Sequence, residues 1–206
     1  NPLTPIRMSL ETLLAASQRV HLDQRFKQLL SECARAVLEE VDRLKRIVDE
    51  FSQFARLPRP QLAQLDLCEL VQGVMALYTG RGNVHFQLAL ESGGLVSIDR
   101  DQLTQVLVNL LKNAEEAMEG RSGSIHVRVK AEAEAVMEVV DEGPGIPVEL
   151  KSRLFEPYVT TKPHGTGLGL AIALRILQEH QGRLEVFDGA TGGALFRASL
   201  PRLSPR

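Results

Sequence analysis

A regular apolar repeat between Leu30 and Phe51 constrains the fold of this chain more than any other feature. Its residues alternate at intervals of four and three: Leu30, Ala34, Val37, Val41, Leu44, Val48 and Phe51. Further apolar residues widen the same face: Leu29, Cys33, Leu38, Ile47 and Phe54. This spacing predicts one long helix that packs in a helical bundle.

A shorter helix is predicted ahead of the repeat, from Leu3 to about Ser17. Its apolar residues are Ile6, Leu10, Leu13 and Leu14. Because two helices alone would leave a wide apolar stripe in water, we predict that residues 1–57 form an antiparallel hairpin that pairs with a second copy into a four-helix bundle. The alternative is that the hairpin folds back onto the rest of its own chain.

The prolines of Leu57-Pro58-Arg59-Pro60 end the second helix and predict a linker over residues 58–64. In residues 65–206, helices are expected from Asp66 to about Tyr78, from Asp99 or Asp101 to about Met118, from Val148 to Leu154 and from Leu168 to about His180. Strands are expected at Val84–Leu90, Leu95–Ile98, Ile125–Val129, the run ending at Asp141, Leu184–Phe187 and Leu195–Leu200. This order predicts an α+β fold, an α/β sandwich with helices on one face of a mostly antiparallel sheet.

Composition narrows the function classes. The chain has 206 residues, of which 44% are hydrophobic and 24% charged, as expected for one globular domain plus a smaller element. Its net charge of -2 offers no basic field for nucleic acid. We expect no membrane segment within this chain, since no run approaches the length of an apolar spanning helix, and no signal peptide before the first helix. Cys33 and Cys68 are isolated, which favours a reducing compartment.

The segment Asp141-Glu142-Gly143-Pro144-Gly145-Ile146-Pro147 follows an apolar run and predicts a strand that delivers one carboxylate to its tip. Glycine at positions 143 and 145 leaves no Cβ near that carboxylate, so a flat ligand could approach the backbone closely. Taken alone, the same pattern also forms ordinary turns, and that interpretation stays open.

Asn109 and Asn113 are four residues apart within a predicted helix and therefore share a face. Asparagine is a poor choice for a helix interior, so both amides need partners. Those partners could lie within the fold. The alternative is an amide oxygen that holds Mg²⁺, which typically takes one or two protein oxygens plus substrate phosphates.

The cluster Gly165-Thr166-Gly167-Leu168-Gly169-Leu170 ends at a predicted helix start, where free N–H groups and the helix dipole favour an anion. It matches neither the dinucleotide fingerprint nor the P-loop. The preceding loop, Leu154 to His164, carries aromatic residues and hydroxyls suited to a mobile lid over a nucleotide. A packed surface loop is the alternative.

Together these segments resemble, in order and spacing, the N, G1, F and G2 boxes of the sensor histidine kinases of two-component signalling. They are Asn109-Leu110-Leu111-Lys112-Asn113-Ala114, Asp141-x-Gly143-x-Gly145, Leu154-Phe155-Glu156-Pro157 and Gly165 to Leu170. Asn1-Pro2-Leu3-Thr4-Pro5-Ile6 resembles the tail of the phosphoacceptor box, and Phe51-Ser52-Gln53-Phe54-Ala55-Arg56 resembles the NtrY or NtrB branch of nitrogen regulation. The resemblance covers essentially the whole chain.

The resemblance implies an ATP site. Asp141 would accept a hydrogen bond from the adenine amino group, which favours ATP over GTP by roughly ten- to a hundredfold. Gly143, Gly145 and Ile146 belong to the same end of the site. Asn113 would ligate Mg²⁺, and Asn109 would support the phosphates.

The second glycine cluster would close on the phosphates in this resemblance. Gly165, Gly167 and Gly169 would let the backbone approach, Thr166 and Leu168 belong to the same segment, and Thr161 and Lys162 are candidate lid contacts. An exposed loop lysine is often merely solvated, so Lys162 could also lack a ligand contact.

The chain departs from the family at two positions. The phosphorylated histidine would lie four residues before Asn1, so we expect this chain to bind ATP without phosphorylating itself. The histidines present are interpreted as structural or surface residues: His21, His85, His126, His164 and His180. Ala194 stands where the family often has threonine, which puts one water-mediated adenine contact in doubt. Asn1 corresponds to a position that orients water for dephosphorylation, and at a chain end we do not expect it to be ordered.

The implied mechanism is in-line transfer of the γ-phosphoryl group of Mg-ATP to a helix-borne histidine, then to an aspartate of a response-regulator receiver domain. The expected setting is the bacterial cytoplasm, with an upstream membrane anchor left open. One alternative is an ATPase of the gyrase, mismatch-repair or chaperone type, which carries a glutamate as base where this chain has Asn109. Another is a nucleotide-sensing dimerisation module without transfer activity.

Overall fold

The structure is a computed structural model that describes residues 3–19, 23–78, 83–91, 94–118, 120–162, 165–190 and 192–203. Asn1, His21 and His164 lie outside these residues. The chain divides into two compact units. The first comprises Asn1–Arg56 and Lys162–Thr166, and the second comprises Leu57–Thr161 and Gly167–Arg206.

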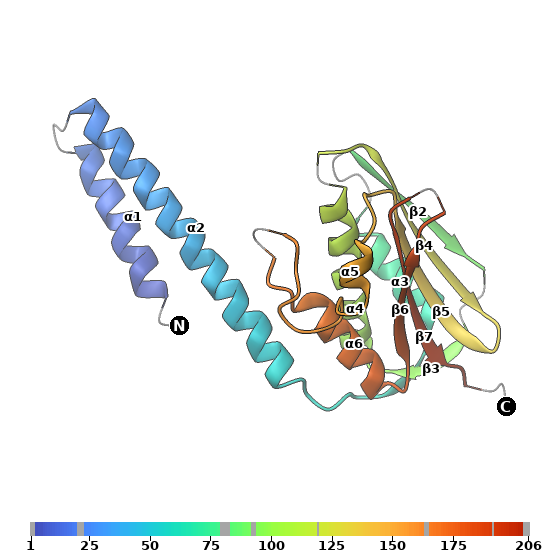
Figure 1. The fold of residues 1–206 in the computed structure, drawn as a ribbon. Coiled ribbons are helices and arrows are strands. Elements are labelled where there is room, and N and C mark those ends of the chain that lie inside the picture. Colours follow the sequence, from blue (N-terminus) through green and yellow to red (C-terminus); the bar gives the residue numbers. More distant parts are fainter. Residues whose placement is uncertain are drawn as a thin grey trace. The chain divides into compact units, whose positions relative to one another are not determined.

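The first unit contains the helical hairpin, formed by α1 (Thr4–Arg19) and α2 (Gln24–Ala55) (Figure 1). The two helices are antiparallel, and Arg7 Nη1 of α1 donates to Asp42 Oδ1 of α2 over 3.0 Å. Ala34 and Val41 of the apolar repeat are buried in this hairpin. The predicted helical hairpin is confirmed.

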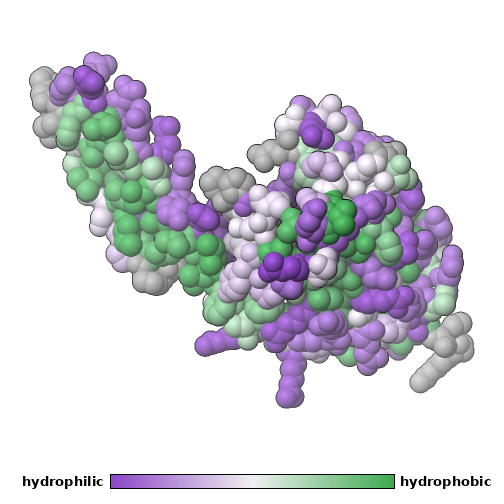
Figure 2. Space-filling view, viewed as in Figure 1, coloured by the Kyte–Doolittle hydropathy of each residue, from purple (hydrophilic) through white to green (hydrophobic). Residues whose placement is uncertain are grey.

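A row of apolar side chains remains exposed along the hairpin, as Figure 2 shows. Its exposed large residues are Ile6, Met8, Leu13, Phe26, Leu29, Val37, Leu44, Val48 and Phe51. Four members of the sequence repeat thus lie in water, although such contiguous apolar faces are rare on monomers.

The second unit is built on a five-stranded sheet with the order β2-β4-β5-β7-β6. The strands are β2 (Val84–Leu90), β4 (Gly123–Ala131), β5 (Glu134–Asp141), β7 (Ala194–Pro201) and β6 (Arg183–Asp188). Only β2 and β4 pair in parallel; the other neighbours are antiparallel. Alternation along β4 and β5 sends Ile125, Val127 and Val139 into the core.

Three helices cover one face of this sheet (Figure 1): α3 (Leu67–Met75), α4 (Arg100–Ala117) and α6 (Gly169–Glu179). The core between the two layers is aliphatic. Its largest fully buried side chains are Leu67, Leu70, Ile98, Leu103, Leu107, Leu110, Leu111, Met118, Ile125, Met137, Leu168 and Ile172. The predicted α+β sandwich with helices on one face is confirmed.

Two details differ from the sequence prediction. A short strand β1 (Ala63–Asp66) pairs with β3 (Leu95–Ile98), within and just after the segment predicted as a linker. Four residues with two polar side chains carry too little periodicity to indicate a strand, and only pairing with β3 creates one. Helix α5 (Val148–Lys151) is shorter than predicted, because the chain continues in tighter turns, with Arg153 N donating to Leu150 O over 3.0 Å.

Candidate functional site

Helix α4 carries a stripe of three residues spaced by four: Asn109, Asn113 and Ala117. The spacing places them on one face, and both asparagines are half-buried. Asn109 Nδ2 donates to the carbonyl oxygen of Gly169 over 3.0 Å. Because Gly169 is the first residue of α6, this bond fixes the stripe against the start of that helix.

The other end of the stripe meets the turn after β5. A Cβ atom on Gly143 would lie 3.0 Å from Ala117 Cβ and 2.8 Å from Asp141 Oδ1. Glycine is therefore required for the turn to approach α4 this closely. Ala117 and Asn109 are separated by about 12 Å along the helix axis, so α4 joins the tip of β5 to the start of α6.

Asp141 is 2% exposed at the end of β5. Its Oδ1 accepts hydrogen bonds from Gly143 N over 2.9 Å and from Ala194 N over 3.2 Å. These donors hold the carboxylate in one orientation and offset part of the desolvation cost of a buried charge. The structure thus brings Asp141, Gly143 and α4 together, as the sequence predicts.

Gly145 and Gly193 form the remainder of this turn region. Both are in the left-handed conformation, with φ of 76° and 71°. A Cβ atom on Gly145 would lie 3.3 Å from Gly193 O, and one on Gly193 would collide with Asp141 O. Ile146 follows Gly145 and is half-buried.

Sequence reasoning missed Gly193 in this region and Ala117 on α4, and it noted Ala194 only through the family resemblance. Gly193 and Ala194 precede and begin β7, and their backbone, not their side chains, contacts Asp141. The double glycine Gly192-Gly193 was the available signal. Ala117 offered none, since an alanine near a helix end is ordinary.

The glycine cluster before α6 contains one position with a local reason for glycine. Gly167 has φ of 68°, and a Cβ atom there would lie 2.6 Å from Tyr158 C. Tyr158 N donates to Gly167 O over 3.0 Å, so the predicted lid is joined to the glycine cluster through the backbone. Leu168 directly precedes α6 and is fully buried.

The predicted lid contacts are divided between the two units. Thr161 is exposed and lies in the second unit, whereas Lys162, Gly165 and Thr166 lie in the first. Gly165 N donates to Lys162 O over 3.2 Å, which forms a turn. Their contact with a nucleotide stays a prediction.

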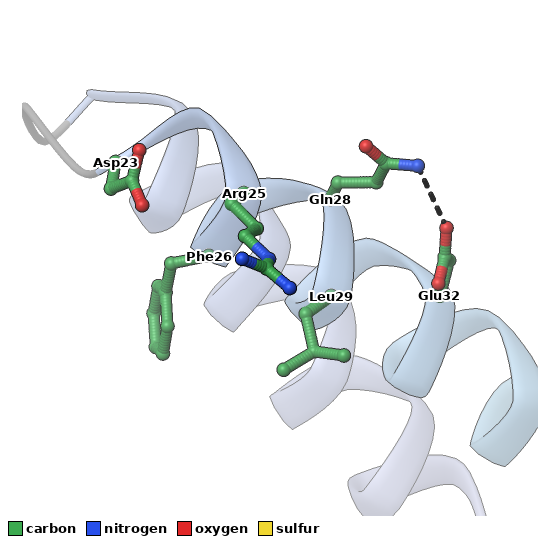
Figure 3. Close-up of a pocket in the computed structure, with 6 residues that line it drawn as sticks. All are labelled: Asp23, Arg25, Phe26, Gln28, Leu29 and Glu32. Atoms are coloured by element: carbon green, nitrogen blue, oxygen red, sulfur yellow. Dashed lines mark hydrogen bonds between the residues drawn. The ribbon is translucent and has the colours of Figure 1, made fainter.

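A surface pocket on the first unit lies apart from these residues in the sequence. Figure 3 shows that its lining comes from the start of α2, where Gln28 Nε2 donates to Glu32 Oε1 over 3.1 Å. Phe26 and Leu29 line it and are both more than half exposed. No residue of the predicted site contributes to it.

Comparison with known proteins identifies the class. The profile of the histidine kinase-, DNA gyrase B- and HSP90-like ATPase family matches residues 98–204. That range contains α4, the Asp141 turn and α6. The chain therefore belongs to this family, and the resemblance drawn from the four boxes is confirmed.

Individual relatives are sensor kinases. Nitrogen regulation protein NtrY of Azorhizobium caulinodans is 38% identical over 100% of this chain and 28% of its own length. The signal transduction histidine-protein kinase AtoS of Escherichia coli is 33% identical over 98% of this chain and 33% of its own length. The chain thus spans about a third or less of these curated relatives.

Solved histidine kinases share the fold. The catalytic domain of histidine kinase ThkA matches with a TM-score of 0.63 and 33% identity, over 69% of this chain and 96% of that one. ThkA in complex with response regulator protein TrrA matches with a TM-score of 0.69 and 26% identity, over 98% of this chain and 60% of that one. Among the described helices, none is long and apolar enough to cross a bilayer.

Proposed function

We propose that this chain is the catalytic part of a sensor histidine kinase of the NtrY-like branch, and that ATP lies along the Asn109–Ala117 face of α4. One observation carries the proposal. The same helix face reaches Gly169 at the start of α6 and Gly143 beside the buried carboxylate. A ligand with a base at one end and an anion at the other suits that arrangement.

Asp141 would recognise the adenine. Two backbone donors fix its carboxylate, and a carboxylate has about four acceptor sites in all. It would accept a bond from the adenine amino group, whereas guanine would turn a carbonyl toward it. Gly143 and Gly145 let the backbone approach the base, and Ile146 would contact its apolar face.

Asn109 and Asn113 would serve the triphosphate, with Asn113 as the protein ligand of Mg²⁺. No cluster of three or more His, Cys, Asp or Glu residues able to hold a metal ion occurs among the described residues. A metal held mainly by phosphates and water, with one amide oxygen, fits this donor set. Such an ion would neutralise charge on the phosphates.

The segment before α6 would close over the phosphates. Gly165, Gly167 and Gly169 would present backbone N–H groups, helped by the positive end of the α6 dipole. Thr166 and Leu168 would contribute their backbone, and Thr161 and Lys162 would approach from the lid.

The reaction would transfer the γ-phosphoryl group to a histidine upstream of Asn1 and then to an aspartate of a receiver domain. The names of the relatives support this assignment, and so does a structural neighbour that is bound to a response regulator. Hydrolysis as in gyrase-type enzymes is less well supported, because the amide of Asn109 cannot take a proton from water at neutral pH. A module that binds nucleotide without transfer is the remaining alternative.

The hairpin would form a homodimer. Its exposed apolar row includes Val37, Leu44, Val48 and Phe51, each 43% exposed or more. Pairing with a second copy would remove this row from water and complete a four-helix bundle. We place the dimer in the bacterial cytoplasm as part of a longer sensor.

Phosphotransfer tests the proposal directly. A longer version that includes the residues before Asn1 should acquire acid-labile, base-stable phosphate from ATP, and residues 1–206 alone should not. The longer version with Asn113→Ala should lose this labelling. Steady phosphate release that disappears on changing Asn109 would instead favour the ATPase, and binding without either reaction would favour the module.

A further inference from the structure

His180 follows the last residue of α6, at the end of the helix opposite to Gly169, and both of its ring nitrogens are engaged. Nδ1 lies 2.7 Å from the carbonyl oxygen of Ile176, and Nε2 accepts the backbone N–H of Asp99 over 2.9 Å. A carbonyl accepts and an N–H donates, so these partners require the neutral ring with its proton on Nδ1. His180 is 5% exposed, so water does not replace these partners.

The bond to Asp99 joins α6 to the start of α4. Asp99 caps α4, with Oδ1 accepting from Asp101 N and Gln102 N over 3.0 and 3.1 Å. At the other end of the pair, Asn109 bonds to Gly169. The two helices are therefore tied at both ends by polar contacts, with an aliphatic interface between them.

The same end of α4 also receives the segment that follows the hairpin. Gln61 N donates to Asp99 Oδ2 over 2.7 Å, and Gln102 Nε2 donates to Pro58 O over 2.9 Å. His180 thus connects the start of α4, and the segment bonded to it, to the end of α6.

We propose that His180 is a positioning residue of the nucleotide site, which sets the axial position of α4 against α6 and so holds Asn109 and Asn113 at the phosphates. The inference rests on the proposed function of those asparagines. If the bond between His180 and Asp99 were lost, α4 could shift along its axis, and the shift would reach Asn109 and Asn113 on the same helix. Displacements near 1 Å at a catalytic group can lower activity about a hundredfold. The two donors that hold the Asp141 carboxylate, Gly143 N and Ala194 N, lie outside α4, so loss of the His180 bond should affect the phosphates more than the base.

Two amide variants separate this role from simple stabilisation. His180→Gln can place its carbonyl oxygen near the position of Nε2 and retain an acceptor for Asp99 N–H. His180→Asn is too short to do so, although its amide can still donate toward Ile176 O. Binding of Mg-ATP and of ADP without Mg²⁺ to residues 1–206 would be measured by calorimetry, with Asp99 amide exchange followed by NMR.

We expect His180→Asn to weaken Mg-ATP binding about tenfold, to change Mg-free ADP binding less than about twofold, and to accelerate exchange of the Asp99 amide. His180→Gln should stay within about threefold of the wild type for both nucleotides. Equal losses for the two nucleotides, no loss, or unfolding of both variants would overturn the positioning role. A wild-type chain that fails to bind Mg-ATP would instead contradict the proposed function, and the inference with it.

Discussion

At the scale of single residues, Asp99 shows how a cap can carry a pH dependence. Partial burial by itself raises the pKa of the Asp99 carboxyl. The backbone N–H groups of Gln61, Gln102 and Asp101 outweigh burial and hold the pKa of the Asp99 carboxyl below its usual value. A carboxyl with a lowered folded pKa stabilises the fold above its unfolded pKa, and that contribution is lost as pH falls through the folded pKa.

Asp99→Ala should therefore lower the free energy of unfolding by about 1 to 2 kcal/mol at pH 7, through loss of the cap. The difference from the wild type should hold at pH values above the usual aspartate pKa of about 4 and shrink below it. Urea unfolding at several pH values measures this. A difference that grows on acidification would contradict the assignment.

Gln181 is a second residue with a measurable conformational cost. It follows α6 with φ of 58°, and Gly182 N donates to Leu177 O over 2.7 Å, the pattern of a helix end that favours glycine. Gln181→Gly should raise the free energy of unfolding by about 0.5 to 1 kcal/mol, because the left-handed strain exceeds the added chain entropy. Thermal unfolding should show a higher midpoint, with an unchanged or lower midpoint contradicting it.

At the scale of elements, the sequence predicted most helices and strands because each has its own periodicity. The heptad spacing of α2, the alternation in β4 and β5 and the cap Asp66 were visible locally, and Asp99 was one of two candidate caps for α4. β1 was not, since it exists only through its partner β3. The site residues divide in the same way, into those visible in the local sequence and those that depend on the fold. Asn109, Asn113, Asp141 and the predicted glycines stood out as residue types, whereas Ala117 and Gly193 contribute only through the place the fold gives them.

The close approach of α4 to the β5 turn makes an element-level prediction. Gly143→Ala would place a Cβ against both Ala117 and Asp141, so the turn would move and ATP affinity should fall at least tenfold, or about 1.4 kcal/mol. Gly73→Ala in α3 is the matched control, since an added Cβ there would meet no atom of the described residues within 4 Å. Calorimetry that shows equal effects for the two variants would contradict this account of the site.

At the scale of the whole molecule, the exposed row on the hairpin is the feature that one chain leaves unexplained. Each half-exposed aliphatic or aromatic side chain that becomes buried contributes on the order of 1 kcal/mol to association. A hairpin pair could bury many of them from both copies, as in other bundles. The sequence indicated this face through its spacing, but spacing alone does not identify the partner.

Residues 1–206 should therefore be dimeric at micromolar concentration in light scattering. Changing Val48 and Phe51 together to Gln should produce a folded monomer, because both lie on the exposed row. Leu77→Gln is the control, since this residue is 71% exposed in the second unit. A wild-type monomer, or a double variant that stays dimeric, would contradict pairing through this face.

Nucleotide selectivity at Asp141 tests the central claim most directly. Calorimetry on residues 1–206 with ATP and GTP in the presence of Mg²⁺ should give a preference for ATP of roughly ten- to a hundredfold. Asp141→Asn should reduce that preference below about threefold, because an amide can donate to the guanine carbonyl. Equal binding of ATP and GTP by the wild type, or an unchanged preference in Asp141→Asn, would contradict the proposal that this buried carboxylate recognises adenine.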